Sequence, residues 1–387
     1  MSDEAMGYEA SHIQVLWGPE AIRKRPGMYV GSVGERGLYQ MVFEVVGRAV
    51  NEVLAGRAGS VDVALTPEDG VRVTDDGPGI PVDVAAGGGP TLETLLTRCS
   101  EAEPDGRHAA AVSLFGRPEL CVANALSSRL TAEVRREGVR WVQEYARGIA
   151  VTPLTAVGSA TGSGTTITFR PDAAVFDTTE CSYAVLAERF RELAHLNHRL
   201  DISLTDERPP GASRSVRYRF RGGARDFVSF LDAGAGTPAH PSVIGFETEE
   251  PRMAGTLEVA LRWRASPEER VRSFANSRPT PDGGTHAEGF RDGTAAAINA
   301  YARRQGLLTA SDPDLSARRI GEGLTAVVSV KLDQPEFLGA TANVLGGTAV
   351  RGCVGQAVRD HLSTWLEEHP EQAAAVLDQI LPGARQV

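Results

Sequence analysis

The segment VTDDGPGIPV, residues 73–82, is the most informative part of this chain about its architecture. The stretch 71–74 has the residue types of a short strand and runs directly into a turn that contains Asp75, Gly77 and Gly79. Glycine permits positive φ angles and lets a ligand approach the backbone closely. A buried aspartate in such a turn is able to accept a hydrogen bond from a purine amino group. The D-x-G-x-G spacing alone is weak evidence for a ligand site, because a plain turn at the end of a strand more often explains it.

A second informative segment, GLYQMVFEVVGRAVNEVLA at residues 37–55, precedes this strand. Its apolar residues recur at the spacing of one face of an α-helix, so a long helix with a buried face is predicted. Glu44 lies in the middle of this helix. A carboxylate on a long amphipathic helix, together with the turn at Asp75, is the candidate functional site that the residues themselves indicate.

Strands and helices alternate along the rest of the chain. The patterns predict helices at 17–25, 91–99, 120–126, 183–197, 227–232, 286–304 and 348–368, and strands at 61–65, 130–136, 139–146, 165–169, 200–204, 216–220, 255–263 and 325–331. Residues 206–215, DERPPGASRS, combine two prolines with glycine and serines, which predicts a domain boundary. The alternation of strands and helices on both sides of it predicts two α/β domains.

Composition limits the classes of protein to which the chain can belong. A chain of 387 residues is long enough for two domains, and a hydrophobic fraction of 42% is typical of a soluble globular protein. The net charge of −10 argues against a protein whose main task is to bind nucleic-acid phosphates. Any contact with DNA is therefore expected to be indirect. Lysine occurs only at Lys24 and Lys331, so a lysine contact to a phosphate is available at two places only.

The N-terminal residues have neither the basic nor the apolar region of a signal peptide, and no stretch reaches the ~18–20 apolar residues that span a bilayer. A cytoplasmic protein without membrane contact is therefore expected. The cysteines are far apart in sequence, without a C-x-x-C spacing, and they are Cys99, Cys121, Cys181 and Cys353. This spacing indicates reduced thiols rather than a zinc site or a disulfide framework, and no metal-ligating residues are predicted.

Several segments, in the same order, closely resemble the ATPase and transducer regions of DNA gyrase B and topoisomerase IV. They are RKRPGMYVG (23–31), GLYQMVFEVV (37–46), VTDDGPGIPV (73–82), NALSSRLTAEV (124–134), SFANSRPTPDGGTHAEGF (273–290) and EGLTAVVSVKL (322–332). The resemblance implies a two-layer α/β sandwich ATPase domain, of the type shared by gyrase, chaperones, mismatch-repair proteins and histidine kinases, followed by a smaller α/β transducer domain. The domains that it implies are an N-terminal dimer arm at 1–15, an ATP-binding domain at 16–206 and a transducer at 216–387.

The resemblance also implies roles for individual residues. Glu44 matches the family's catalytic base, Asp75 matches the aspartate that binds adenine, and Thr165 matches the threonine that shares a water molecule with that aspartate. Gly77 and Gly79 belong to the same ligand-binding turn. The apolar walls of the adenine pocket match Val45, Val73, Ile80 and Ile167.

Further matches concern partners and inhibitors. Tyr8 matches the arm residue that reaches into the partner's nucleotide site when the family dimerises, so a homodimer or a heterodimer with gyrase subunits is an expected assembly. Asp75 and Arg136 match contacts to aminocoumarin antibiotics, whereas Pro78 replaces the arginine that helps to bind them.

The sequence departs from the family where the metal would lie. Arg48 occupies the position of the asparagine that coordinates Mg²⁺, and because a guanidinium group cannot coordinate a cation, this argues against Mg²⁺ binding. Arg48 lies four residues after Glu44 on the same helix face, so an ion pair that neutralises the proposed base is expected. The alternatives are that Arg48 points to solvent or that it neutralises a phosphate directly.

The sequence also departs from the family where the phosphates would lie. Residues 113–119, SLFGRPE, replace the glycine-rich run whose amides hold the triphosphate, and Pro118 and Glu119 oppose a phosphate on steric and electrostatic grounds. The lid lysine of the family falls at Pro104, and the Q-T-K loop of the transducer reads Ala340-Thr341-Ala342. Together these changes predict weak ATP binding and impaired hydrolysis.

Three functions remain open on this basis, and the sequence does not decide whether the protein is an enzyme. The first is a stand-alone gyrase B-like paralogue that binds a nucleotide or another small ligand in the remnant adenine pocket and acts as a regulatory, decoy or resistance protein. The second is an active ATPase subunit of a type II topoisomerase. The third is a scaffold repurposed for small-molecule chemistry, with His108 or Cys99 as candidate groups. The chain ends at Val387 without the E-G-D-S-A motif of the DNA-cleaving domain, so it is not expected to act alone as a topoisomerase.

Overall fold

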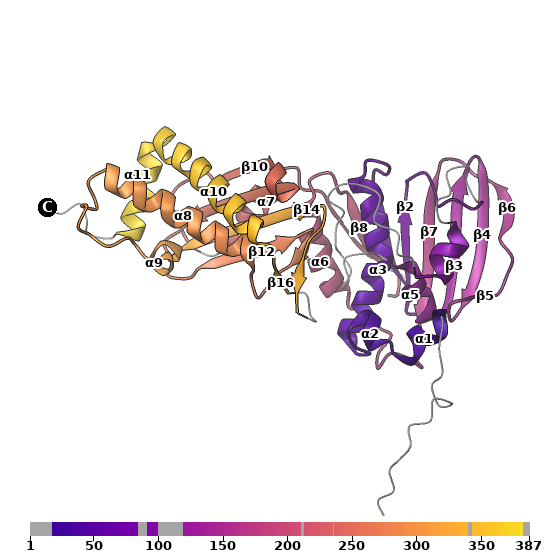
Figure 1. The fold of residues 1–387 in the computed structure, drawn as a ribbon. Helices are drawn as coiled ribbons and strands as arrows, with labels where there is room; N and C mark the ends of the chain where they lie inside the picture. Colours follow the sequence, from indigo (N-terminus) through magenta and orange to yellow (C-terminus); the bar gives the residue numbers. More distant parts are fainter. Residues whose placement is uncertain are drawn as a thin grey trace, which may run out of the picture.

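A computed structural model describes residues 18–83, 91–99, 119–209, 213–234, 236–339 and 343–381 of the chain. These residues form two α/β halves that lie side by side, the N-terminal half in indigo and magenta and the C-terminal half in orange and yellow (Figure 1). Each half has its own main sheet and its own hydrophobic core. Within the described ranges, every helix is too short or too polar to cross a membrane.

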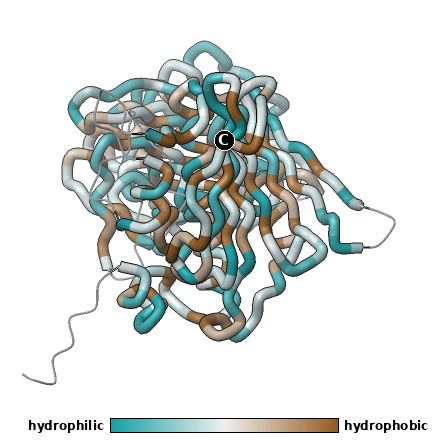
Figure 2. Tube along the Cα trace, turned by 90° about the vertical axis from the view of Figure 1, so that its right-hand side faces the viewer, coloured by the Kyte–Doolittle hydropathy of each residue, from teal (hydrophilic) through white to brown (hydrophobic). Residues whose placement is uncertain are grey.

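The N-terminal half is built on a nine-stranded sheet with the order β5-β4-β3-β7-β2-β1-β8-β9, and β6 also pairs with β4. The strands are β1 (Val61–Thr66), β2 (Gly70–Asp75), β3 (Ser127–Arg136), β4 (Val139–Ala146), β5 (Ile149–Ala150), β6 (Thr155–Ser159), β7 (Gly164–Pro171), β8 (Ile202–Asp206) and β9 (Arg214–Tyr218). Along β2, β3 and β7 buried positions alternate with more exposed ones, and Figure 2 shows hydrophobic and hydrophilic residues alternating along strands of this half. The alternation gives the sheet one face that packs on the core.

Helices cover that buried face and complete a two-layer sandwich. They are α1 (Gly18–Lys24), α2 (Gly27–Val30), α3 (Glu35–Leu54), α4 (Leu92–Thr97), α5 (Leu120–Ala125) and α6 (Tyr183–Leu196). The 20-residue α3 packs against β1 and β2 and buries one apolar face, which includes Leu38, Val42 and Val45. This packing brings the middle of α3 close to the end of β2.

The C-terminal half has a five-stranded sheet with the order β10-β11-β14-β12-β13. Its strands are β10 (Ile244–Glu250), β11 (Gly255–Trp263), β12 (Arg270–Ala275), β13 (Arg278–Pro279) and β14 (Leu324–Leu332), and a separate pair is formed by β15 (Phe337–Leu338) and β16 (Val344–Leu345). The helical elements are α7 (Gly223–Asp232), η2 (Pro251–Met253), α8 (Thr285–Arg304), α9 (Ala317–Gly321), α10 (Thr348–Glu368) and α11 (Pro370–Ile380). The central strand β14 is buried along almost its whole length, because helices cover both of its faces.

Helices α8 and α10 pack very closely on each other. A Cβ atom added to Gly289 of α8 would lie 2.4 Å from the carbonyl oxygen of Arg351 on α10, and one added to Gly293 would lie 2.4 Å from that of Gly355. The backbones approach this closely only because glycine has no side chain at these two positions.

The two halves meet at the C-terminal end of α6. Leu196 belongs to a small buried cluster with residues of α7, β11, β12 and β14, namely Ala224, Phe227, Val228, Ala260, Phe274 and Val327. Asn197 Nδ2 donates to Ser277 Oγ at 2.9 Å, and Arg189 Nη2 donates to the carbonyl oxygen of Ser277 at 2.9 Å. Apolar and polar contacts therefore join α6 to the sheet of the C-terminal half.

The predicted α/β fold is confirmed, and several predicted elements coincide with observed ones, for example 139–146, 255–263 and 348–368. The strands on the two sides of the boundary predicted at 206–215 both belong to the first sheet. Strand β9 pairs antiparallel with β8, with Tyr218 opposite Ile202, so this segment connects the two strands of a hairpin in the first sheet.

Candidate functional site

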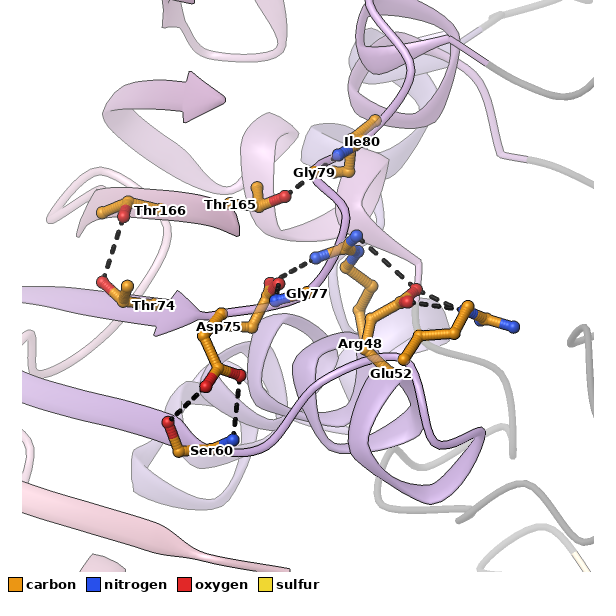
Figure 3. Close-up of polar contacts among 12 residues, drawn as sticks. Arg48, Glu52, Ser60, Thr74, Asp75, Gly77, Gly79, Ile80, Thr165 and Thr166 are labelled. Atoms are coloured by element: carbon orange, nitrogen blue, oxygen red, sulfur yellow. Dashed lines mark hydrogen bonds and ion pairs between the residues drawn. The ribbon is translucent and has the colours of Figure 1, made fainter. Parts of the chain in front are cut away.

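Asp75 is the last residue of β2 and lies opposite Thr165 of β7, on the buried face of the sheet. The amide of Gly77 donates to Asp75 Oδ1 at 3.0 Å, and the amide of Ile80 donates to Thr165 Oγ1 at 3.1 Å (Figure 3). These two hydrogen bonds fix the turn after β2 to both strands. The structure thus brings together four residues that the sequence placed in one site.

The two glycines of this turn are required for different reasons. Gly79 has a φ of 78°, and a Cβ atom there would lie 2.8 Å from the carbonyl oxygen of Arg135. Gly77 is not among the residues with positive φ, but a Cβ atom there would lie 2.9 Å from Asp75 Oδ1. Gly79 therefore has the positive φ that the sequence suggested, whereas Gly77 is needed because a side chain there would collide with the Asp75 carboxylate. Arg136 Nη1 donates to the carbonyl oxygen of Gly79 at 3.1 Å, which places Arg136 beside the same turn.

Arg48 reaches from α3 to the aspartate at the centre of the site. Its Nη1 atom lies 2.6 Å from Asp75 Oδ2, and its Nη2 atom lies 3.6 Å from Glu52 Oε1 on the same helix (Figure 3). The sequence predicted a pair between Arg48 and Glu44. Among the described residues, the ion pairs of Arg48 are instead with Asp75 and Glu52, because the side chain extends toward the end of β2.

The charges around Arg48 balance one another. Burial raises the pKa of the Asp75 carboxyl above its usual value, and the charge of Arg48 and the hydrogen bond from Gly77 oppose that effect. Burial also acts to raise the pKa of Glu52, but the hydrogen bond from Arg57 and the charges of Arg57 and Arg48 bring it below its usual value. Arg48 therefore supplies the positive charge that compensates two acids at the edge of the core.

Glu44 lies one helical turn before Arg48 and is only 2% exposed. Its carboxylate accepts hydrogen bonds from Gln40 Nε2 at 3.1 Å and from the backbone amide of Glu119 at 2.8 Å. Glu119 is the residue just before α5. Glu44 thus links α3 to the start of α5.

The apolar residues proposed for the pocket walls all lie in the N-terminal core. Val45 is on α3, Val73 on β2 and Ile167 on β7, where Ile167 lies opposite Val73, and Ile80 follows the turn. Each of them is at most 2% exposed. They pack around the same end of β2 that carries Asp75.

The position at which the family places its metal-ligating asparagine is occupied by Arg48 in this chain. The group there is the Arg48 guanidinium, which has no lone pair to offer a cation and is already engaged by Asp75 and Glu52. Several other predicted residues lie outside the described residues: Tyr8 with the arm at 1–15, Pro104, His108, the stretch 113–118 and Ala340–Ala342.

Two features of the site were not predicted. Asp76 accepts hydrogen bonds from the amides of Gly59 and Ser60 at 2.7 and 2.9 Å, so it fastens the start of β1 to the turn after β2. Cys99, Glu119 and Cys121 converge at the ends of α4 and α5. Both are contacts between segments that are distant in sequence, and periodicity carries no signal for them.

A sheet with one layer of helices, a buried glutamate on the long helix and an Asp-x-Gly-x-Gly turn at a strand end define the class of the N-terminal half. This half has the histidine kinase-, DNA gyrase B- and HSP90-like ATPase fold, and the pattern of that family matches residues 34–175. The DNA gyrase B pattern matches residues 223–386. The chain belongs to the family of DNA gyrase B and the ATPase component of topoisomerase IV.

Individual relatives agree with this assignment. The DNA gyrase B protein of Streptomyces coelicolor is 43% identical over 393 residues, covering 97% of this chain and 57% of the relative. The 43K ATPase domain of Thermus thermophilus gyrase B, solved in complex with an aminocoumarin, is 31% identical with a TM-score of 0.79 and coverages of 95% and 94%. The topoisomerase IV ATP-binding domain of Francisella tularensis is 27% identical with a TM-score of 0.75 and coverages of 96% and 98%. The chain therefore spans less than two thirds of the length of the Streptomyces coelicolor relative.

Proposed function

We propose that this protein is a gyrase B-type nucleotide-binding protein in which Arg48 restrains Asp75, so that ATP binds weakly and is hydrolysed slowly. The observation that carries the proposal is the distance of 2.6 Å between Arg48 Nη1 and Asp75 Oδ2. A ligand that uses the Asp75 carboxylate as a hydrogen-bond acceptor has to compete with this guanidinium. The role that fits best is that of a regulatory paralogue, which keeps the ATPase scaffold and responds to a ligand without rapid turnover.

The strength of the Arg48–Asp75 ion pair determines how much it weakens the binding of a ligand to Asp75. Removing one partner from a buried pair costs ~3–5 kcal/mol. The Arg48 side chain is 16% exposed and also contacts Glu52, so a smaller cost is expected here. A cost of about 2–3 kcal/mol corresponds to a roughly 30- to 150-fold loss of affinity for a ligand that must displace Arg48.

The alternative is an active ATPase subunit of a type II topoisomerase. The observation in its favour is that Glu44, Asp75 and Thr165 are all present, buried and hydrogen-bonded, and that the C-terminal half has the gyrase B pattern. In this case Arg48 would move from Asp75 to the phosphates when nucleotide binds. Both proposals include partnership with a second copy of the chain, with gyrase subunits or with a DNA-cleaving partner.

The decisive measurement is the affinity for ATP and the rate of phosphate release, in the presence of Mg²⁺, for the wild-type protein and for Arg48→Asn. Asparagine is the residue of the resembling family at this position, and it releases Asp75. We expect the affinity of Arg48→Asn for ATP to be at least ~10-fold higher than that of the wild type. Arg57→Asn is the matched control, because Arg57 pairs with Glu52 and is not a partner of Asp75. Fast turnover by the wild type that Glu44→Ala abolishes would support the active enzyme instead.

Aminocoumarins provide a second probe of the same pocket. The Thermus thermophilus relative was solved with such a compound, and Asp75 and Arg136 lie on either side of the turn at Gly79 in this chain. We propose that binding of an aminocoumarin is limited by the same Arg48–Asp75 pair. Calorimetric titration is expected to show tighter binding of the aminocoumarin to Arg48→Asn than to the wild type. Equal affinities would show that the aminocoumarin does not need the part of Asp75 that Arg48 occupies.

A further inference from the structure

We propose that Cys99, Cys121 and Glu119 form a binding site for a thiophilic divalent cation of the zinc class. The Sγ atoms of the two cysteines and a carboxylate oxygen of Glu119 all lie within 4.8 Å of one another. The proposal goes beyond the nucleotide site and does not depend on the function proposed for it.

The separations fit tetrahedral coordination by sulfur and oxygen. Zinc binds thiolates at ~2.3 Å and carboxylate oxygens at ~2.0–2.2 Å, so its ligand atoms lie about 3.5–4 Å apart. Cys121 Sγ donates a hydrogen bond to Glu119 Oε2 at 3.8 Å, and this separation also suits two ligands of one ion once the thiol proton has left. Two thiolates and one carboxylate supply three ligands, and a water molecule completes the four, as in an open zinc site.

The fold holds the three groups in place and leaves one side accessible. Cys121 is in the first turn of α5 and is buried, whereas Cys99 follows α4 and is exposed. Asn124 Nδ2 donates to the carbonyl oxygen of Leu96 at 2.8 Å and so ties α5 to α4. A cation can therefore enter past Cys99 and meet a ligand that is already fixed in the core.

The charges near the site favour a cation. Among the residues that the structure describes, two carboxylates lie beside the cysteines: Glu119, which is a member of the cluster, and Glu44, which accepts a hydrogen bond from the Glu119 amide. Tyr29 lies close enough to Cys99, Cys121 and Glu119 for their charges to raise its pKa, after the larger effect of its burial. A divalent cation would replace two thiol protons, which pass to the solvent. The two thiolates, the Glu119 carboxylate and the ion would then carry a net charge of −1.

The site is coupled by one hydrogen bond to the glutamate of the nucleotide site. The backbone amide of Glu119 donates to Glu44 Oε2 at 2.8 Å, and the Glu119 side chain is a proposed metal ligand. A bound ion would therefore fix Glu119, whose backbone amide donates the hydrogen bond to Glu44. Metal binding here concerns a different set of atoms from the Mg²⁺ ion that the family uses.

Cobalt(II) is the probe of choice, because thiolate ligation gives it a charge-transfer absorption band that oxygen ligands do not give. We expect the reduced, chelator-treated full-length chain to bind one equivalent of Co²⁺ with this band and to release it to zinc. Cys99→Ser and Cys121→Ser are each expected to lose at least half of the band and to bind zinc at least ~100-fold more weakly, the upper end of what loss of an outer-sphere partner costs. Glu119→Gln should keep the band and bind more weakly.

Cys353→Ser is the matched control, since Cys353 is also a buried helical cysteine and lies in the C-terminal half. It should leave the cobalt spectrum unchanged. Cys99 is exposed, so its variant tests the site without disturbing the core. The proposal is overturned if the reduced wild type shows no thiolate–cobalt band, or if Cys99→Ser and Cys121→Ser retain the full band. Rapid conversion of the pair to a disulfide without any metal affinity would overturn it as well.

Discussion

Arg48 Nη1 and Asp75 Oδ2 lie 2.6 Å apart although the two residues are 27 positions apart in sequence. Because Asp75 is 2% exposed, this contact leaves a charged pair at the edge of the N-terminal core. A buried charge that loses its partner has to be solvated or neutralised, which is costly. The pair is therefore expected to contribute to stability, and under the proposed function it also limits the access of a ligand to Asp75.

The first prediction concerns this pair. Asp75→Asn should lower the free energy of unfolding by about 2–3 kcal/mol, because it leaves the Arg48 guanidinium with Glu52 alone. Urea denaturation measures the change. The double variant Arg48→Asn/Asp75→Asn should be less destabilised than the sum of the single variants. Additive effects would show that the two side chains do not interact in solution.

The turn at Gly79 is the subject of the second prediction. Gly79→Ala should destabilise the protein by about 2–4 kcal/mol, since it combines the strain of a left-handed conformation with a Cβ atom 2.8 Å from the carbonyl oxygen of Arg135. Gly162→Ala is the control, because Gly162 has a similar φ of 76° with no atom within 4 Å of its Cβ position. Its cost should stay near 1 kcal/mol. Equal thermal shifts for the two variants would show that only the dihedral angle matters.

The packing of α8 on α10 leads to the third prediction. Gly289→Ala should cost about 2–4 kcal/mol, because the added methyl group would meet the carbonyl oxygen of Arg351 at 2.4 Å and force the helices apart. Gly352 lies on α10 with no atom within 4 Å of its Cβ position. Gly352→Ala should therefore be neutral or stabilise the helix by up to about 1 kcal/mol. Denaturation of both variants under the same conditions provides the comparison.

Buried histidines make stability depend on pH, which is the fourth prediction. Burial lowers the pKa values of His195, His240 and His286 to about 4, from an ordinary value of 6.5. The unfolded chain takes up these protons below pH 6.5 while the folded protein resists them until about pH 4. The free energy of unfolding should therefore fall as the pH drops through this range, by on the order of 2 kcal/mol for each histidine.

His195 allows this prediction to be checked one group at a time. Its ring stacks on Phe220 at a centroid distance of 3.6 Å and on Phe227 at 4.8 Å. His195→Phe keeps an aromatic ring between these neighbours and removes one titrating group. Its stability should vary less between pH 6.5 and pH 4 than that of the wild type. An unchanged pH dependence would mean that His195 titrates normally in the folded state.

The sequence predicted those parts of the fold that depend on local periodicity. The apolar spacing of residues 37–55 predicted the helix that became Glu35–Leu54, and the strand at 255–263 was predicted with its observed bounds. β6 was missed because all of its residues are exposed, so no buried face shaped its pattern. The pairing of β8 with β9 was not predicted, because a sequence that is rich in proline and glycine suits a linker as well as a connection within a sheet.

The structure brings several residues of the candidate site together, but the sequence did not predict their contacts. Asp75 and Thr165 were assigned to one pocket by resemblance, and the structure places them opposite each other. The prediction that Arg48 pairs with Glu44 was wrong. A spacing of four residues places two side chains on the same face of a helix but does not determine where a long side chain ends. Cys99 and Cys121 come together through the packing of α4 on α5, which the spacing of cysteines in a sequence cannot report.

The contact between α6 and the second sheet has a consequence for how the protein melts. Leu196 of the N-terminal half is buried among residues of the C-terminal half, and Ser277 of the C-terminal half accepts hydrogen bonds from Arg189 and Asn197. Unfolding of either half exposes part of the apolar surface of the other and removes these hydrogen bonds. The two halves therefore gain cooperativity from a small shared core, and heat should melt them in one calorimetric transition instead of two.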